Sequence, residues 1–151
     1  MIHQYISYLS YTKGYSANTL KSYTQALTQF VNYRKQCDSN ARWSTTTAGD
    51  VQDYLAWMKQ CEKSTATIHL HASAIKGLFR FIVHNGGTID KAIYHVECPK
   101  MVKSDVATIA PADIEETIAD TSLSIDTRLI IALIADSGLR ISEVLSLRPL
   151  D

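Results

Sequence analysis

The chain has 151 residues, of which 46% are hydrophobic, so it can fold around a core and is not disordered as a whole. Fifteen Lys and Arg residues balance fifteen Asp and Glu residues, and this net charge of zero at first argues against a nucleic-acid-binding protein. No signal peptide and no stretch of the ~20 apolar residues that a membrane span needs are visible, so we expect a cytoplasmic protein without membrane contact.

The charges are unevenly distributed along the chain. Residues 1–100 carry eleven Lys or Arg against six Asp or Glu, a net charge of +5, and residues 101–151 carry four against nine, a net charge of −5. A basic N-terminal part suits a phosphate backbone, although an ordinary basic helical domain has the same charge. Cys37, Cys61 and Cys98 lack the spacing of a zinc motif and are predicted to be reduced thiols, so no metal site is expected.

Four amphipathic helices are predicted in the first part of the chain, over residues 2–11, 17–35, 48–61 and 65–84. In each of them apolar residues recur at spacings of three and four. The predicted N-caps of the last three are Ser16, Thr46 or Thr47, and Ser64. Short connections between four helices predict a compact all-α bundle.

The fourth predicted helix carries a polar and basic stripe beside its apolar face. The stripe consists of His69, Ser73, Lys76 and Arg80, which follow one another at spacings of four, three and four. Such a stripe can contact phosphates, and it can equally be a solvated surface.

The remainder of the chain is predicted to begin with a basic linker over residues 99–107. A helix follows over residues 111–119, opened by Pro111, and then a nearly all-apolar segment over residues 125–135 predicts a buried helix. The sequence therefore predicts a domain over residues 1–98, the linker, and a second unit over residues 108–151.

A tight corner between two helices is predicted around Gly138 and Arg140. Gly138 is placed to end one helix with a positive φ, and a second helix would start near Arg140, with apolar residues as far as Leu147. The Arg140 guanidinium could bind two oxygens of one phosphate, and Glu143, one turn on, could fix its rotamer. A purely structural Arg–Glu pair is the competing interpretation.

This corner resembles a known motif. The run Ser137-Gly138-Leu139-Arg140-Ile141-Ser142-Glu143-Val144-Leu145-Ser146-Leu147 is similar to the first catalytic-arginine motif of the tyrosine recombinase (phage integrase) family. Two earlier stretches resemble the core-binding domain of the same family. They are Tyr15-Ser16-x-x-Thr19-x-x-x-Tyr23, and Ser64-x-x-Thr67 followed by Ala72-Ser73-Ala74-Ile75-Lys76. Where members of the family often carry an arginine, this chain has Leu70.

The resemblance implies an all-α fold, a SAM-like core-binding bundle of four to five helices followed by a truncated, helical N-terminal part of the catalytic domain. It implies binding of double-stranded DNA, assembly with other recombinase protomers, and phosphotyrosyl transesterification by the full-length protein without a cofactor. Arg140 would bind the scissile phosphate, with Glu143 in support. The expected DNA contacts are Thr19, Lys21, Thr67, His69, Ser73, Lys76, Arg80, Lys100 and Lys103.

The order of residues along the chain bears on activity. All eight tyrosines occur at or before Tyr94, and none can take the place of the family's late nucleophile. We expect an N-terminal fragment that cleaves no DNA alone and whose exposed apolar surface can support a homodimer. The alternatives are a helix-turn-helix regulator that uses residues 125–147, and an all-α interaction module.

Overall fold

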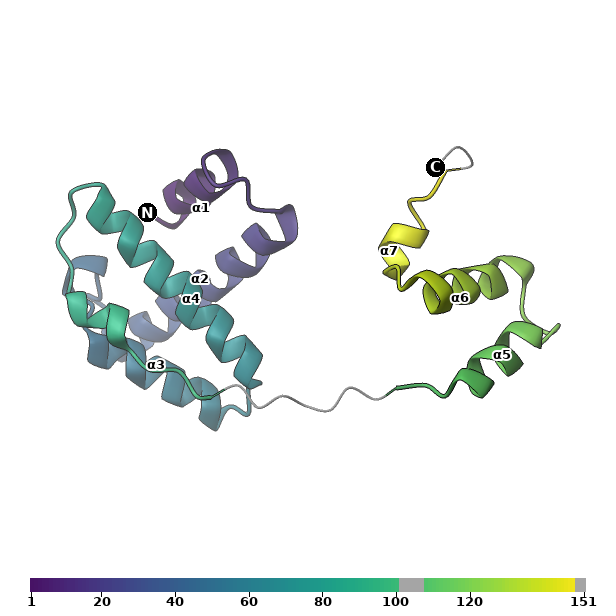
Figure 1. The fold of residues 1–151 in the computed structure, drawn as a ribbon. Coiled ribbons are helices and arrows are strands. Elements are labelled where there is room, and N and C mark those ends of the chain that lie inside the picture. Colours follow the sequence, from purple (N-terminus) through teal and green to yellow (C-terminus); the bar gives the residue numbers. More distant parts are fainter. Residues whose placement is uncertain (101–107, 149–151) are drawn as a thin grey trace. The chain divides into compact units, whose positions relative to one another are not determined.

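The computed structural model describes residues 1–100 and 108–148, and within these ranges it contains seven α-helices, two short 3-10 helices and no strand (Figure 1). The all-α fold class is therefore confirmed. The chain divides into two compact units, Met1–Lys103 and Ser104–Asp151, which are described separately below. No helix in the described part of the chain is long and apolar enough to span a bilayer.

The first unit is built from α1 (Ile2–Tyr11), α2 (Ala17–Cys37), α3 (Ala48–Gln60) and α4 (Thr65–His84), with the 3-10 helices η1 (Trp43–Thr45) and η2 (Lys91–His95). All four predicted helices are present, with ends within two residues of the prediction. Each predicted N-cap hydroxyl accepts a backbone N–H: Ser16 from Thr19 at 3.3 Å, Thr47 from Asp50 at 3.2 Å, and Ser64 from Thr67 at 3.2 Å. These caps start the helices because they satisfy N–H groups that the first turn leaves unpaired.

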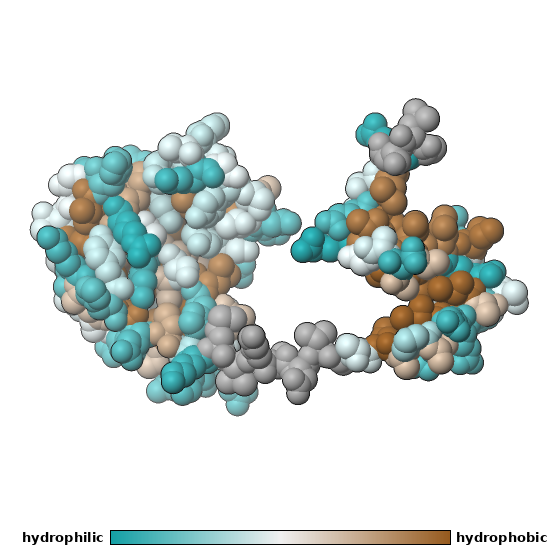
Figure 2. Space-filling view, in the orientation of Figure 1, coloured by the Kyte–Doolittle hydropathy of each residue, from teal (hydrophilic) through white to brown (hydrophobic). Residues whose placement is uncertain are grey.

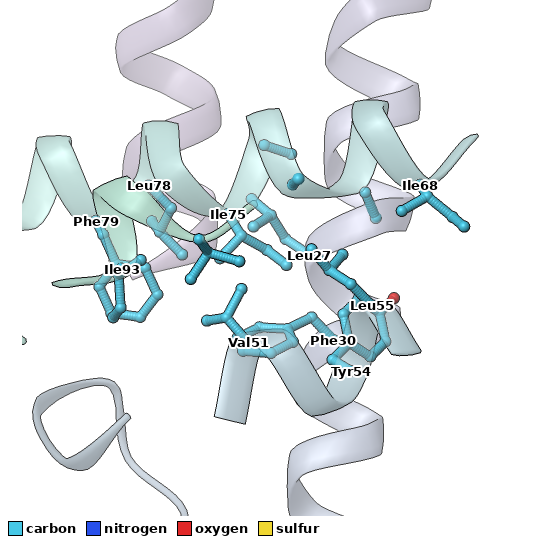
Figure 3. Close-up of a cluster of buried hydrophobic side chains, with 14 of the residues drawn as sticks. Leu27, Phe30, Val51, Tyr54, Leu55, Ile68, Ile75, Leu78, Phe79 and Ile93 are labelled. Carbon is cyan, nitrogen blue, oxygen red and sulfur yellow. The ribbon is translucent and has the colours of Figure 1, made fainter. Parts of the chain in front are cut away.

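The core lies where α2, α3 and α4 meet, and η2 closes one end of it (Figure 3). Leu27 and Phe30 of α2, Tyr54 of α3 and Phe79 of α4 are all buried. In addition to the predicted apolar face of α4, the side chains of His71, Ala74 and Leu78 are buried. The buried surface of α4 is wider than one stripe because α1, α2, α3 and η2 all pack against this helix.

The segment after α4 belongs to the first unit. Ile93 and Val96 are buried in the core. Asp90 accepts the backbone N–H of Ala48 at 2.8 Å and that of Ala92 at 2.9 Å, so one carboxylate joins the starts of α3 and η2. These two hydrogen bonds hold the pKa of Asp90 below its usual value. Most of the predicted linker, residues 101–107, lies outside the described residues.

The second unit consists of α5 (Pro111–Ala119), α6 (Ile125–Ser137) and α7 (Ile141–Val144). The Arg128 Nε of α6 donates to the Ile118 carbonyl of α5 at 2.5 Å, and this bond satisfies a carbonyl in the last turn of α5. Hydrogen bonds from Ser122 lower the pKa of Asp120, and the nearby Arg128 charge adds a smaller shift in the same direction.

This unit differs from the sequence prediction at two points. The apolar pattern of α6 is typical of a buried helix, but α6 has no buried residue among those described, where only α5 and α7 pack against it, and this agrees with the apolar surface expected of a fragment. Ile125 is 78% exposed and Leu129 57% exposed, and apolar surface is visible over this unit (Figure 2). The helix after Arg140 is a single turn that ends at Val144, so Leu147 lies beyond it.

Candidate nucleic-acid interface

The α6–α7 corner places Arg140 where the sequence predicts it. Gly138 ends α6 with φ 67°, in the left-handed region that a glycine adopts without steric cost, and its N–H donates to the Ile134 carbonyl at 3.0 Å. Two residues later the chain enters α7 with Arg140 as its N-cap. The turn is therefore tight, and it leaves the Arg140 side chain largely exposed to solvent.

Glu143 holds Arg140 at two points. Its Oε2 accepts the Arg140 backbone N–H at 2.7 Å, and its Oε1 lies 3.1 Å from Nη1 of the guanidinium. The Arg140 side chain is 82% exposed and that of Glu143 46% exposed, so the ion pair is worth little to stability. The ion pair instead fixes the position of the guanidinium, because Nη1 is held by Glu143 while the other N–H donors remain available to a ligand.

The predicted polar and basic stripe of α4 lies against residues 94–99. The Lys76 Nζ donates to the Val96 carbonyl at 2.6 Å, and the His69 Nε2 donates to the Pro99 carbonyl at 2.5 Å. The Arg80 guanidinium lies over the Tyr94 ring, 5.6 Å from its centroid. Three members of the stripe thus hold the chain that leaves the bundle, and Ser73 remains exposed between them.

The other predicted DNA contacts are scattered over the first unit. Lys21 and Lys100 are exposed. The Thr19 and Thr67 hydroxyls lie 2.9 Å and 2.8 Å from the hydroxyls of Ser16 and Ser64, and so they belong to the two helix caps. Lys103 lies outside the described residues. The structure therefore gathers no single cluster of cations from this set.

One electrostatic feature was missed by the sequence prediction, although the sequence contains it. Neither α2, with 21 residues, nor α4, with 20, contains an Asp or a Glu. The two longest helices of the unit therefore present no carboxylate that would repel a polyanion. Counting acidic residues helix by helix, rather than over whole halves of the chain, would have revealed it.

Among the described residues, no group of three or more His, Cys, Asp and Glu side chains is placed to hold a metal ion. The one buried histidine, His71, lies 2.8 Å through its Nδ1 from the Tyr54 hydroxyl, inside the core. Burial lowers the pKa of His71 and raises that of Tyr54. This pair is a structural hydrogen bond between α3 and α4.

Comparison with known proteins agrees with the helical architecture of the first unit. Residues 2–86, more than half of the chain, match the family described as "Phage integrase, N-terminal SAM-like domain". The chain belongs to this family.

The similar curated proteins are tyrosine recombinases. Tyrosine recombinase XerD of Oceanobacillus iheyensis is 30% identical over 99% of this chain and 52% of its own length. XerD of Listeria monocytogenes is 24% identical over 98% of the chain and 51% of its length. Tyrosine recombinase XerC of Bacillus pumilus is 26% identical over all of the chain and 50% of its length. The chain thus spans about half the length of these relatives.

Proposed function

We propose that this chain is the N-terminal, DNA-binding portion of a tyrosine recombinase. The observation that carries the proposal is the exposed arginine at the α6–α7 corner, which is held by Glu143 in a chain whose residues 2–86 match the integrase SAM-like family. The first unit binds duplex DNA, and the recombinase acts together with further protomers of its kind.

Electrostatics supports the first part of this proposal. The net charge of +5 on residues 1–100 and the acid-free helices α2 and α4 favour an anionic partner, such as a phosphate backbone, over a basic or neutral one. Contacts to phosphate set the position and orientation of a protein on DNA and carry little sequence information. Lys21 and Lys100, which are exposed, suit that role.

The chemistry of the corner supports the second part. A guanidinium with one side fixed by a carboxylate and the other open can bind two oxygens of one phosphodiester, and can stabilise added negative charge as a nucleophile attacks phosphorus. We propose this role for Arg140, with Glu143 as a positioning residue. All eight tyrosines precede Arg140, so we infer that this chain alone cleaves no strand.

The helix-turn-helix alternative is disfavoured by the length of α7. A recognition helix must present several side chains along the major groove, and α7 has only four residues, one turn.

Fluorescence anisotropy with labelled duplex DNA at a series of salt concentrations tests the proposal. We expect binding that weakens as salt rises, with a log–log slope that grows by about 0.9 for each phosphate contacted. Lys21→Met should reduce the slope by about 0.9, the value for one phosphate contact. The matched control is Lys59→Met, which removes an exposed lysine from the acid-containing helix α3 and should leave the slope unchanged. Absence of salt-dependent binding would overturn the proposal.

Arg140 needs a separate measurement, because both the structural and the phosphate-binding interpretations place it beside Glu143. Arg140→Ala and Glu143→Ala both break the ion pair, but only the first removes the phosphate ligand. We expect Arg140→Ala to weaken DNA binding and to reduce the salt slope, and Glu143→Ala to leave the slope almost unchanged. Equal effects of the two variants would support a structural pair.

A further inference from the structure

Contacts within the first unit limit which side chains of α2 and α4 are available to contact DNA bases. On α4 two stripe members, His69 and Lys76, donate to the backbone carbonyls of Pro99 and Val96, and Arg80 lies over the Tyr94 ring. A side chain that already donates to a backbone carbonyl can donate to a base edge only after this hydrogen bond is broken. The sequence-reading residues are therefore to be sought on a face whose polar groups have no partner within the unit.

The C-terminal half of α2 has such a face, whereas nearer its start the Ser22 hydroxyl donates to the Asn18 carbonyl at 3.0 Å. Asn18, Ser22, Gln25, Gln29 and Asn32 follow one another at spacings of four, three, four and three, so they lie along one side of the helix. This side, here called the amide stripe, is turned away from the buried Leu27 and Phe30, and all its members are exposed or half-buried. Within the described residues, the side chains of Gln25, Gln29 and Asn32 form no hydrogen bond.

The C-terminal half of the amide stripe borders a hollow of about 660 Å³ between α2, the end of α3 and the start of α4. Its lining includes Gln25, Gln29, Asn32, Lys63, Thr67 and His71. No carboxylate lines this hollow, and Lys63 adds a positive charge at its edge. The surroundings therefore offer amide and hydroxyl donors and acceptors in a field that is neutral to positive.

The chemistry of a primary amide decides which partner this face suits. A Gln or Asn side chain offers a donor and an acceptor side by side, which matches the acceptor N7 and donor N6 on the major-groove edge of adenine. A helix of 21 residues is about 31 Å long and fits lengthwise into the major groove. The stripe spacings of four and three residues place neighbouring amides about 6 and 4.5 Å apart along the helix, which corresponds to one to two base pairs along the groove.

We propose that α2 is the sequence-reading helix of this chain, with Gln25, Gln29 and Asn32 as specificity-determining residues that favour A·T pairs at the positions they contact. This inference rests on the proposed DNA binding and adds to it the face and the bases that are read. It assigns His69 and Lys76 to holding the 94–99 segment rather than to reading sequence.

The test is a selection of bound duplexes from a randomised DNA library by the 151-residue chain, followed by affinity measurements on the enriched sequence and on variants of it. We expect adenine to be enriched at neighbouring positions of one strand. Gln25→Ala and Gln29→Ala should each lower the discrimination at one such position by about 5- to 100-fold while salt-dependent binding to unrelated duplex persists.

Matched variants make the result specific to the amide stripe. Gln52→Ala removes an exposed amide from α3, outside the stripe, and should leave the enriched sequence unchanged. Lys76→Met should leave base preference unchanged as well, because its ammonium group is engaged by Val96. Circular dichroism of each variant would confirm that the helices are intact.

The possible outcomes separate the two proposals. Salt-dependent binding without base preference, or a preference that the α2 variants do not alter, overturns this inference and leaves the proposed DNA binding in place. A preference abolished by Lys76→Met but not by Gln29→Ala would transfer the reading role to α4. Absence of DNA binding overturns both proposals and would direct attention to a protein partner for the hollow.

Discussion

Gly77, in the middle of α4, is required by the packing of α1. A Cβ atom at this position would overlap the Tyr5 hydroxyl and lie 3.2 Å from Cζ of the same ring. Tyr5 is only 3% exposed, so its rigid ring has little room to move aside. The two helices approach closely because one of them lacks a side chain at the point of contact.

We predict that Gly77→Ala lowers the free energy of unfolding by about 1–3 kcal/mol, although alanine is the better helix former by about 1 kcal/mol. Urea unfolding followed by circular dichroism measures the change. In a Tyr5→Phe background the overlapping hydroxyl is absent, and the same substitution should cost less. A gain in stability from Gly77→Ala in the wild-type background would show that α1 does not pack here.

The buried Tyr54–His71 pair makes stability depend on pH. Burial lowers the pKa of His71 in the folded state, so below the ordinary histidine value of about 6.5 the unfolded chain binds a proton that the folded chain does not. The stabilising effect of a neutral His71 is complete above that value, and it is lost as the pH falls towards the lower folded-state pKa.

We therefore predict that the melting temperature falls as the pH is lowered from about 7 to about 5, and that His71→Gln has a shallower dependence over the same range. Glutamine keeps a hydrogen-bonding group near Tyr54 but does not titrate. Differential scanning calorimetry at several pH values gives the comparison. Parallel curves for the two proteins would mean that His71 is accessible to protons in the fold.

At the scale of elements, α4 acts as the support on which residues 94–99 are held. Lys76 and His69 donate to two carbonyls of this segment, and Arg80 lies over the Tyr94 ring. A hydrogen bond from an ammonium group contributes about 1.5–3 kcal/mol, whereas a partly exposed cation–π contact contributes about 0.5–1 kcal/mol. Lys76 is therefore the main polar anchor.

We predict that Lys76→Met increases amide hydrogen exchange in residues 94–98 by about tenfold or more, while exchange in α4 changes little. Methionine keeps most of the aliphatic stem and removes the donor. Arg80→Met, which removes only the ring contact, should have a smaller effect on the same amides. Unchanged exchange in Lys76→Met would identify Lys76 as an ordinary surface lysine.

At the scale of the whole molecule, the second unit carries apolar surface that nothing within the unit covers. Ile125 and Leu129 on α6, and Ile141 and Leu145 at the α7 turn, are each more than half exposed. Exposed apolar area of a few hundred Å² is typical of a protein–protein contact, at roughly 25 cal/mol per Å² of area removed from water. The opposite charges of residues 1–100 and 101–151 offer a second, electrostatic route to association.

We predict concentration-dependent self-association of the chain that persists at high salt, because the apolar contact rather than the charge difference supplies most of the free energy. Analytical ultracentrifugation at low and at high salt measures it. Leu129→Glu should weaken the association by at least about tenfold, and Thr121→Glu, on an exposed turn of the same unit, should not. A monomer at all concentrations would contradict the prediction, and dissociation by salt alone would favour the electrostatic route.

Residue types and their spacing were enough to predict the helices, their caps and the arginine corner. Ser16, Thr47 and Ser64 cap helices, Gly138 has a positive φ, and Glu143 lies within reach of Arg140, because each feature depends on residues no more than four apart. Interactions over so short a range depend only on residue types and their spacing, so they can be predicted without knowledge of the fold.

The segment that packs against each face of a helix could not be predicted from local sequence and follows from the fold. The spacing of the α4 stripe is that of a free basic surface, but His69 contacts Pro99, 30 residues away, and α6 has the apolar pattern of a buried helix but no buried residue among those described. Periodicity tells which side of a helix is apolar or polar, but not which distant segment lies against that side. The partners of α4 and α6 therefore followed from packing between segments remote in sequence.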